Sequence, residues 1–139
     1  TDDLNGEATW VKTSQALTPL YSGGFTNQPM LNGSTYRLPL GARVLNFTNG
    51  VAVLSGGNLT QNWTNTVTLG ADNKVVNTSS NTLSLTITLR TGLLRGSFVE
   101  PGTGRRVSFT GALQQKQNVG LGYFLGPTQS GEVRFEAAP

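Results

Sequence analysis

The sequence predicts an all-β fold, an antiparallel barrel-like meander of roughly 8–10 strands, with a β-sandwich as the alternative. Short apolar segments recur along the chain, and Gly, Asn and Pro turn signals separate them. No window shows the three- and four-residue apolar spacing of an amphipathic helix. Several glycines fall inside the predicted strands, which favours the tight bends of a barrel. With 139 residues, the chain is most simply a single domain over residues 1–139.

The N-terminal part is predicted to contain one strand and one hairpin. Residues 6–13, GEATWVKT, form an apolar-polar segment with Trp10 in its middle. The dipeptide Asn32-Gly33 is a hairpin-turn signal, and it predicts pairing between strands at 25–31 and 34–38. Pro29 lacks an amide hydrogen, so the first of these strands should be an edge or irregular strand.

A second hairpin is predicted around Asn49-Gly50, between strands at 44–47 and 51–54. The Gly pair in Ser55-Gly56-Gly57 should then end the strand. A Thr- and Asn-rich strand follows over residues 59–69, with Trp63 at its centre.

Residues 83–136 show the most regular alternation, and we predict an up-and-down antiparallel meander there. A symmetric turn at 101–104 places Phe98 opposite Val107 and Glu100 opposite Arg105, and the same counting places Leu85 opposite Phe98. The predicted inner face consists of Leu83, Leu85, Ile87, Leu89, Leu94, Gly96, Phe98, Val107, Phe109, Gly111, Leu113, Val133 and Phe135.

The strand around residues 119–125 has two possible registers. In one, Val119, Leu121, Tyr123 and Leu125 face the core, and in the other Gly120, Gly122 and Phe124 do so. A shift of one residue exchanges the two faces. The second register would leave an apolar outer stripe that the N-terminal half must cover.

Composition argues against most enzyme classes. The chain contains no Cys and no His, which removes thiolate chemistry and the commonest general base and metal ligand. Its seven carboxylates fall in a tail, in turns or at outward strand positions, which does not favour a catalytic pair. We therefore predict a protein that is not an enzyme and that uses no cofactor or metal.

Charge and hydropathy restrict the partners. Only 12% of residues are charged, and the net charge is +3. The densest basic group is Arg90, Arg95, Arg105 and Arg106, which is typical of exposed strand ends, and no Lys/Arg run predicts nucleic-acid binding. No apolar segment approaches the length of a transmembrane helix, so no membrane span is predicted.

Two segments within residues 83–136, GLLRGSFVEP and VSFTGALQQKQNVGLGYFLGPTQSGEVRFE, resemble an uncharacterised all-β module. This module recurs near the C-termini of large secreted bacterial proteins of the verrucomicrobial type. The upstream segments YSGGF and VLNFTNGVAVLSGGNL resemble its earlier part. The resemblance implies a secreted or cell-surface setting and an accessory role in a longer multidomain chain, and it transfers no catalytic or ligand-binding residues.

Aromatic side chains are the remaining candidates for a site. Their faces stack on the apolar C–H face of a sugar ring, while neighbouring amides supply hydrogen bonds. Trp63 lies among polar residues, including Gln61 and Asn62, which predicts an exposed ring; the competing interpretation is that both tryptophans fill the core. The candidate ligand-binding residues are Trp63, Asn62, Gln61, Trp10 and Tyr36, with Tyr21 and Tyr123 as further aromatic candidates.

These observations favour a non-catalytic extracellular accessory module that binds carbohydrate, with a polysaccharide or cell-surface glycan as partner. The alternative is a structural or sorting module of a large bacterial surface protein.

Overall fold

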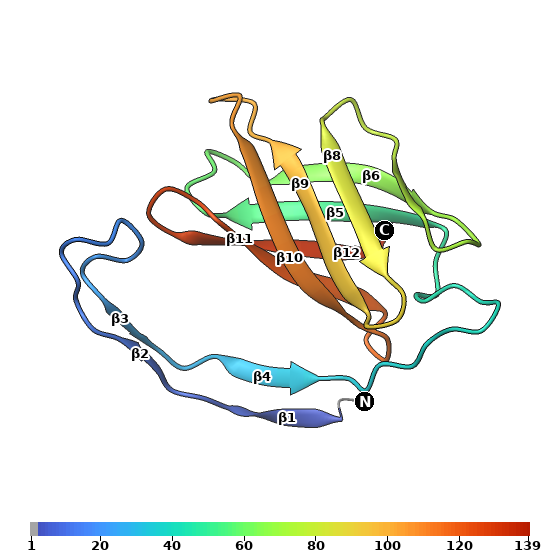
Figure 1. Cartoon of the computed structure of the whole chain (residues 1–139), viewed down its shortest axis with the longest axis horizontal. Helices are drawn as coiled ribbons and strands as arrows, with labels where there is room; N and C mark the ends of the chain where they lie inside the picture. The colour runs from blue at the N-terminus through green and yellow to red at the C-terminus, as the bar shows by residue number, and fades with distance from the viewer. Residues whose placement is uncertain (1–2) are drawn as a thin grey trace.

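The computed structural model describes residues 3–139, and within them every regular element is a β-strand (Figure 1). Eight strands form one antiparallel sheet in the order β7-β6-β5-β12-β11-β10-β9-β8. The edge strands β7 and β8 are consecutive in sequence, and the sheet curls into a nearly closed barrel, which confirms the predicted fold class. The barrel strands are β5 (Asn49–Gly56), β6 (Trp63–Leu69), β7 (Val75–Asn77), β8 (Leu83–Thr88), β9 (Leu93–Val99), β10 (Arg106–Gln114), β11 (Val119–Leu125) and β12 (Ser130–Ala137).

Four short strands precede the barrel and form a long hairpin, which we call the N-terminal arm (residues 4–33). β1 (Leu4–Glu7) pairs with β4 (Met30–Gly33), and β2 (Trp10–Lys12) pairs with β3 (Phe25–Asn27). The two paired regions are joined by a hydrogen bond of 3.1 Å from the Ala8 amide to the Pro29 carbonyl. Figure 1 shows the arm arching along one side of the barrel.

The predicted hairpin around Asn32-Gly33 is wrong. These two residues are inside β4, where they pair with Asn5 and Leu4 of β1. Residues 34–38 form no strand. The sequence signal describes a local turn preference, but a more distant strand competes for the same backbone hydrogen bonds and takes them.

The predicted hairpin around Asn49-Gly50 is also wrong, because this dipeptide begins β5. Gly50 is required for packing here. A Cβ atom on it would lie 2.7 Å from the Phe47 ring and 2.7 Å from the Glu136 carbonyl oxygen. Residues 44–47 form no strand, yet Val44 and Leu45 are buried. The segment 34–48 thus packs against the core without joining the sheet.

The predicted inner faces of β8, β9, β10 and β12 are confirmed. Phe98 and Val107 are paired as predicted, and Glu100 faces Arg105 across the turn, where its amide donates to the Arg105 carbonyl at 2.9 Å. One register was wrong by two residues, since Phe98 pairs with Leu83 and Leu85 pairs with Gly96. A two-residue shift preserves the face, so the inward set is unchanged.

Of the two predicted registers of β11, the structure has the second, in which Gly120 and Phe124 face the core. Gln114 pairs with Val119 across a four-residue loop, and Gly120 and Phe124 turn inward. Tyr123 and Leu125 point outward and are about half exposed, at 54% and 51%. Val119, at the start of the strand, is also buried. The outer face of β11 therefore carries the apolar stripe that this register requires.

The first residues of the described chain tie the arm to the barrel. The Lys116 ammonium, in the loop between β10 and β11, is paired with the Asp3 carboxylate. The Thr35 amide donates to the same carboxylate at 2.6 Å. These hydrogen bonds, from Lys116 first and Thr35 second, lower the pKa of Asp3 from 3.8 to about 2.

This anchor predicts a pH-dependent attachment of the arm. Because the pKa of Asp3 is lower in the folded protein, its contribution to stability is present above about pH 4 and is lost as the pH falls towards about 2. We expect Asp3→Asn to accelerate hydrogen exchange of the Thr35 amide at neutral pH. The difference from the wild-type protein should shrink between about pH 4 and 2, and a difference that stays constant over this range would contradict the assignment.

Candidate functional site

A groove of about 880 Å³ lies between the N-terminal arm and the outer face of the barrel. The barrel contributes its wall from β11 and from the first residue of β12, and the arm contributes β2, β3 and the loop between them. We call it the arm groove. Its lining residues are Trp10, Lys12, Leu20, Tyr21, Phe25, Thr26, Asn27, Tyr123, Leu125 and Ser130.

Two aromatic rings on the arm pack against a third, that of Phe25. Phe25 is the central ring, with the Trp10 ring 5.5 Å away at 72° and the Tyr21 ring 5.0 Å away at 68°. Both are edge-to-face arrangements, the geometry that aromatic pairs favour. Trp10 nevertheless remains 62% exposed, so a large part of its surface is available to a ligand.

Tyr21 fixes the tip of the arm to the barrel. Its hydroxyl lies 2.8 Å from Ser130 Oγ and accepts from the Ser130 amide at 2.9 Å. Its own amide donates to the Thr128 carbonyl at 3.0 Å. The backbone of Tyr21 has φ of 50°, a left-handed conformation that costs an L-residue about 1–2 kcal/mol. Three hydrogen bonds to one turn offset that cost and hold the aromatic cluster above β11.

The groove contains little charge. Of the residues 3–139 that line it, Lys12 alone is charged, and its ammonium donates to the Tyr21 carbonyl at 3.1 Å. None of these described lining residues is a carboxylate. Thr26, Asn27 and Ser130 add neutral polar groups at its border. This arrangement can hold a ligand by aromatic contact and hydrogen bonds, and it offers no paired carboxylates for acid-base chemistry.

The structure places Trp10, one of the predicted site residues, in the arm groove, together with Tyr21 and Tyr123. Trp63 lies elsewhere. It is half-buried on the inward side of β6 and packs against the core, so the prediction of a freely exposed ring is wrong. The hollow beside it, shared with Leu54 and Phe98, holds only about 10 Å³. Gln61 and Asn62, its polar neighbours before β6, belong to an exposed loop and do not form the environment of the ring.

Tyr36 is also a packing residue. Its hydroxyl donates to the Leu89 carbonyl, and its ring lies against Gly92 in the turn between β8 and β9. Burial raises the pKa of its phenol. Trp63 is at the opposite end of the β8–β9 hairpin, beside Thr82 and Val99. The two rings therefore cannot act on one small ligand.

Gln61 and Asn62 are exposed in the loop before β6, and neither lines the arm groove. Phe25, Leu20 and Lys12 line the groove but were not predicted from the sequence. A signal for them existed, because the second register of β11 requires that some N-terminal segment cover Tyr123 and Leu125. That requirement could not show which segment does so.

No protein-family model, no curated protein and no solved structure matches this chain. Within residues 3–139 there is no helix of the length and apolarity needed to cross a membrane. The same residues bring no three metal-ligating side chains together. Fold and site together define a barrel-like all-β domain whose outer face is spanned by an aromatic arm.

Proposed function

We propose that this protein is a non-catalytic carbohydrate-binding module and that the arm groove is its binding site. The observation that carries the proposal is the meeting of exposed aromatic rings from two separate parts of the fold. Trp10 comes from the arm and Tyr123 from the barrel, and both line one groove. Exposed aromatic side chains gathered in this way usually mark an interaction site.

The chemistry of the groove suits a sugar chain. Aromatic rings provide flat apolar surfaces for the C–H faces of pyranose rings, and Asn27, Thr26 and Ser130 provide hydrogen-bonding groups for hydroxyls. The volume of about 880 Å³ lies within the range of ligand sites, roughly 300–1,000 Å³.

The proposed setting is extracellular or at the cell surface, within a longer chain. The low content of charged residues and the Thr- and Asn-rich surface support it. In this setting the module would hold its parent protein on a polysaccharide, and affinity would come from aromatic stacking without chemical turnover.

The proposal predicts that Trp10→Ala and Tyr123→Ala each weaken glycan binding strongly while the protein stays folded. By analogy with base stacking, one stacked ring contributes about 1–3 kcal/mol, so each variant should lose about 5-fold to 150-fold in affinity. A glycan array followed by calorimetry on the best ligand measures this. Both side chains are more than half exposed, so the melting temperature should change by only a few degrees.

Val76→Ala is the matched control, because Val76 is an exposed apolar residue on β7 and does not line the groove. This variant should bind like the wild-type protein. Glycan binding that survives both aromatic substitutions would place the site elsewhere. A wild-type protein that binds no glycan on the array would refute the function and favour the structural or sorting role.

A further inference from the structure

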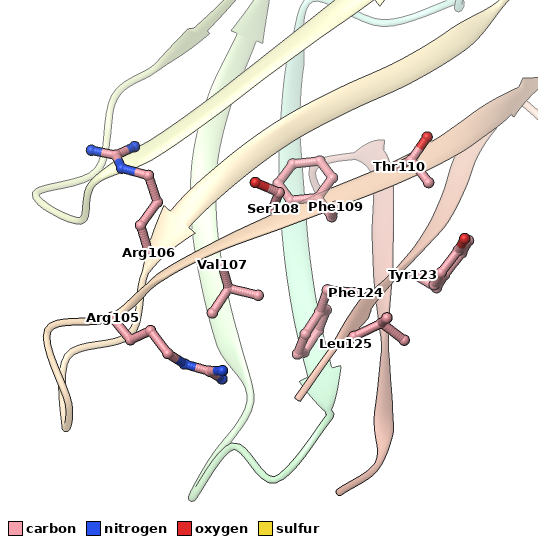
Figure 2. A pocket seen from close by; sticks show the side chains of 9 residues that line it. All are labelled: Arg105, Arg106, Val107, Ser108, Phe109, Thr110, Tyr123, Phe124 and Leu125. Atoms are coloured by element: carbon pink, nitrogen blue, oxygen red, sulfur yellow. The ribbon is translucent and has the colours of Figure 1, made fainter. Parts of the chain in front are cut away.

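The arm groove continues past the arm into a second pocket on the barrel. This pocket has a volume of about 360 Å³ and lies between β10 and the end of β11 (Figure 2). Tyr123 and Leu125 line it as well as the arm groove, so the two hollows meet at these side chains. Its other lining residues are Arg105, Arg106, Val107, Ser108, Phe109, Thr110 and Phe124.

The second pocket exists because β10 is longer than β11. The pairing of these strands ends at Phe109 and Phe124, whereas β10 continues back to Arg106 and remains paired with β9 alone. Figure 2 shows the two strands separating there, with Val107 and Phe124 facing the space between them. A ligand chain leaving the arm groove over Tyr123 can therefore follow β10 towards its first residues.

Two arginines stand at the far end of this path, and they differ in direction. Figure 2 shows the guanidinium of Arg105 directed towards Phe124, while Arg106 points away from the pocket. Arg106 instead donates to Ser97 Oγ on β9 at 3.0 Å. Arg105 is consequently the cation that a ligand in the pocket would meet.

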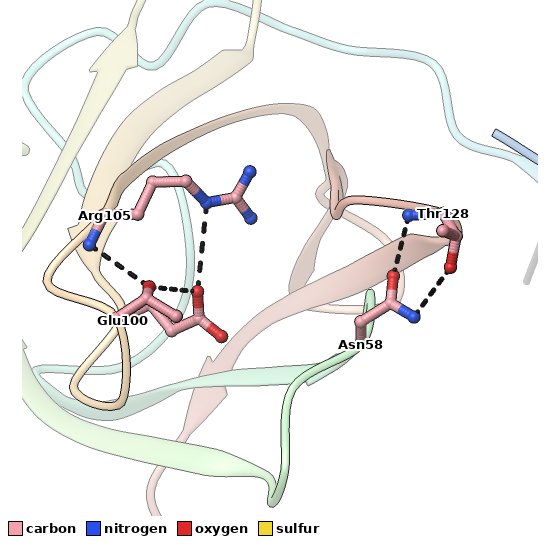
Figure 3. A network of polar contacts seen from close by, with 5 residues as sticks. Asn58, Glu100, Arg105 and Thr128 are labelled. Carbon is pink, nitrogen blue, oxygen red and sulfur yellow. Dashed lines mark hydrogen bonds and ion pairs between the residues drawn. The ribbon is translucent and has the colours of Figure 1, made fainter. Parts of the chain in front are cut away.

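The guanidinium of Arg105 is only partly engaged. Its contact with Glu100 is made through Nε, at 3.9 Å from Oε2 (Figure 3). The same carboxylate oxygen accepts a hydrogen bond from Thr103 at 2.7 Å. Within residues 3–139 the two terminal nitrogens of Arg105 donate no hydrogen bond to another side chain. The Arg105 side chain is 46% exposed. The planar fork of a guanidinium matches a carboxylate in bidentate geometry.

A second hollow also leads away from Tyr123, and the charged side chain that lines it is negative where Arg105 is positive. This hollow of about 450 Å³ leads across β12, and Glu132 is the one charged side chain among the described residues that line it. A neutral chain could follow either hollow, whereas an anionic chain is repelled by Glu132 and attracted by Arg105 and Arg106. The charges thus select both a path and a class of ligand.

We propose that the ligand is an acidic polysaccharide built of uronic acids, whose carboxylate is bound by Arg105 while a neighbouring sugar ring stacks on Tyr123. This inference rests on the proposed carbohydrate-binding function and makes it specific. Arg106 adds long-range attraction without contact. Arg105 acts as the residue that determines specificity, and the aromatic groove supplies the contact shared by all glycans.

The test compares polygalacturonate with its fully methyl-esterified form, which has the same chain without the negative charge. The wild-type protein should bind the acid form about tenfold more tightly at about 0.15 M salt. Arg105→Gln should remove this difference by weakening binding of the acid form only. Arg90→Gln is the matched control, because Arg90 is an exposed arginine in the β8–β9 turn, about 20 Å from Arg105 along β9 at ~3.3 Å per residue.

A further variant keeps the test decisive if Arg105→Gln unfolds. Glu100→Gln removes the competing carboxylate and leaves Arg105 in place, so it should tighten binding of the acid form several-fold; weaker binding would overturn the inference. Equal binding of the two polymers would also overturn the inference, as would equal losses of affinity from Arg105→Gln and Arg90→Gln. Neither result would contradict the proposed carbohydrate-binding function. Binding that is unaffected by Tyr123→Ala would instead refute the arm groove as the site.

Discussion

Phe98→Ala is expected to lower the free energy of unfolding by about 3–5 kcal/mol, the usual range for removing a buried aromatic ring. Phe98 is 4% exposed and packs edge-to-face on Phe124, with ring centroids 5.2 Å apart at 79°. Its neighbours in the adjacent strands, Leu83 and Val107, are buried too. The cavity left by alanine would therefore be enclosed by side chains from three strands.

Arg95→Ala provides the control on the same strand. Arg95 is exposed and lies three residues before Phe98, on the opposite face of β9. Replacing it with alanine should lower the free energy of unfolding by less than about 0.5 kcal/mol, as for most surface substitutions. Urea titration of the two variants measures the difference. Similar costs for both would mean that the core does not occupy the face of β9 assigned here.

The inner face of the C-terminal strands could be predicted from sequence because the large apolar residues there recur mostly at every second position. Leu83 and Leu85 on β8 and Val133 and Phe135 on β12 alternate in this way, and turning either strand over would expose these residues. Alternation does not determine which residues pair across two strands. A shift of two residues keeps every side chain on its face, which is why Leu85 was predicted opposite Phe98 in place of Leu83.

β11 shows where alternation is insufficient. Both of its faces carry large apolar residues, so periodicity could not choose between Tyr123 and Phe124 as the core residue. The choice depends on loop length and on room inside the barrel. Phe124 fits because glycines, Gly57 and Gly131, lie against its ring. Those contacts connect residues that are distant in sequence, and no local pattern contains them.

The candidate site was only partly predictable for a similar reason. Trp10 and Trp63 each lie in a short segment with polar neighbours, and the neighbours of Trp63 made it the stronger candidate for exposure. In the structure Trp10 is the exposed tryptophan, and Trp63 is half-buried. Trp63 shares its strand face with the buried Val67 and Leu69, whereas Trp10 belongs to a two-stranded arm without a core of its own. Exposure is set by the tertiary position of the strand and not by adjacent residues.

Gly131→Ala is expected to destabilise the protein by about 1–3 kcal/mol, the cost of overfilling a packed core. Gly131 is buried on β12 and pairs with Phe124 on β11. A Cβ atom on it would lie 2.1 Å from Phe124 Cζ and 2.4 Å from Cε1. The ring cannot simply move away, since Gly57 lies against its other edge, where a Cβ atom would be 2.2 Å from Cε2.

A double-mutant cycle tests whether the Phe124 ring is the cause of this cost. Phe124→Leu removes the ring atoms that a Cβ on Gly131 would meet, so the double variant should be more stable than the sum of the single variants predicts, by at least about 0.5 kcal/mol. Gly102→Ala is the matched control, because Gly102 is exposed in the β9–β10 turn and a Cβ atom added to it would meet no other atom within 4 Å. It should change stability by less than about 0.5 kcal/mol. Additive costs of Gly131→Ala and Phe124→Leu would show that the alanine is excluded by the backbone of β12 and not by the ring.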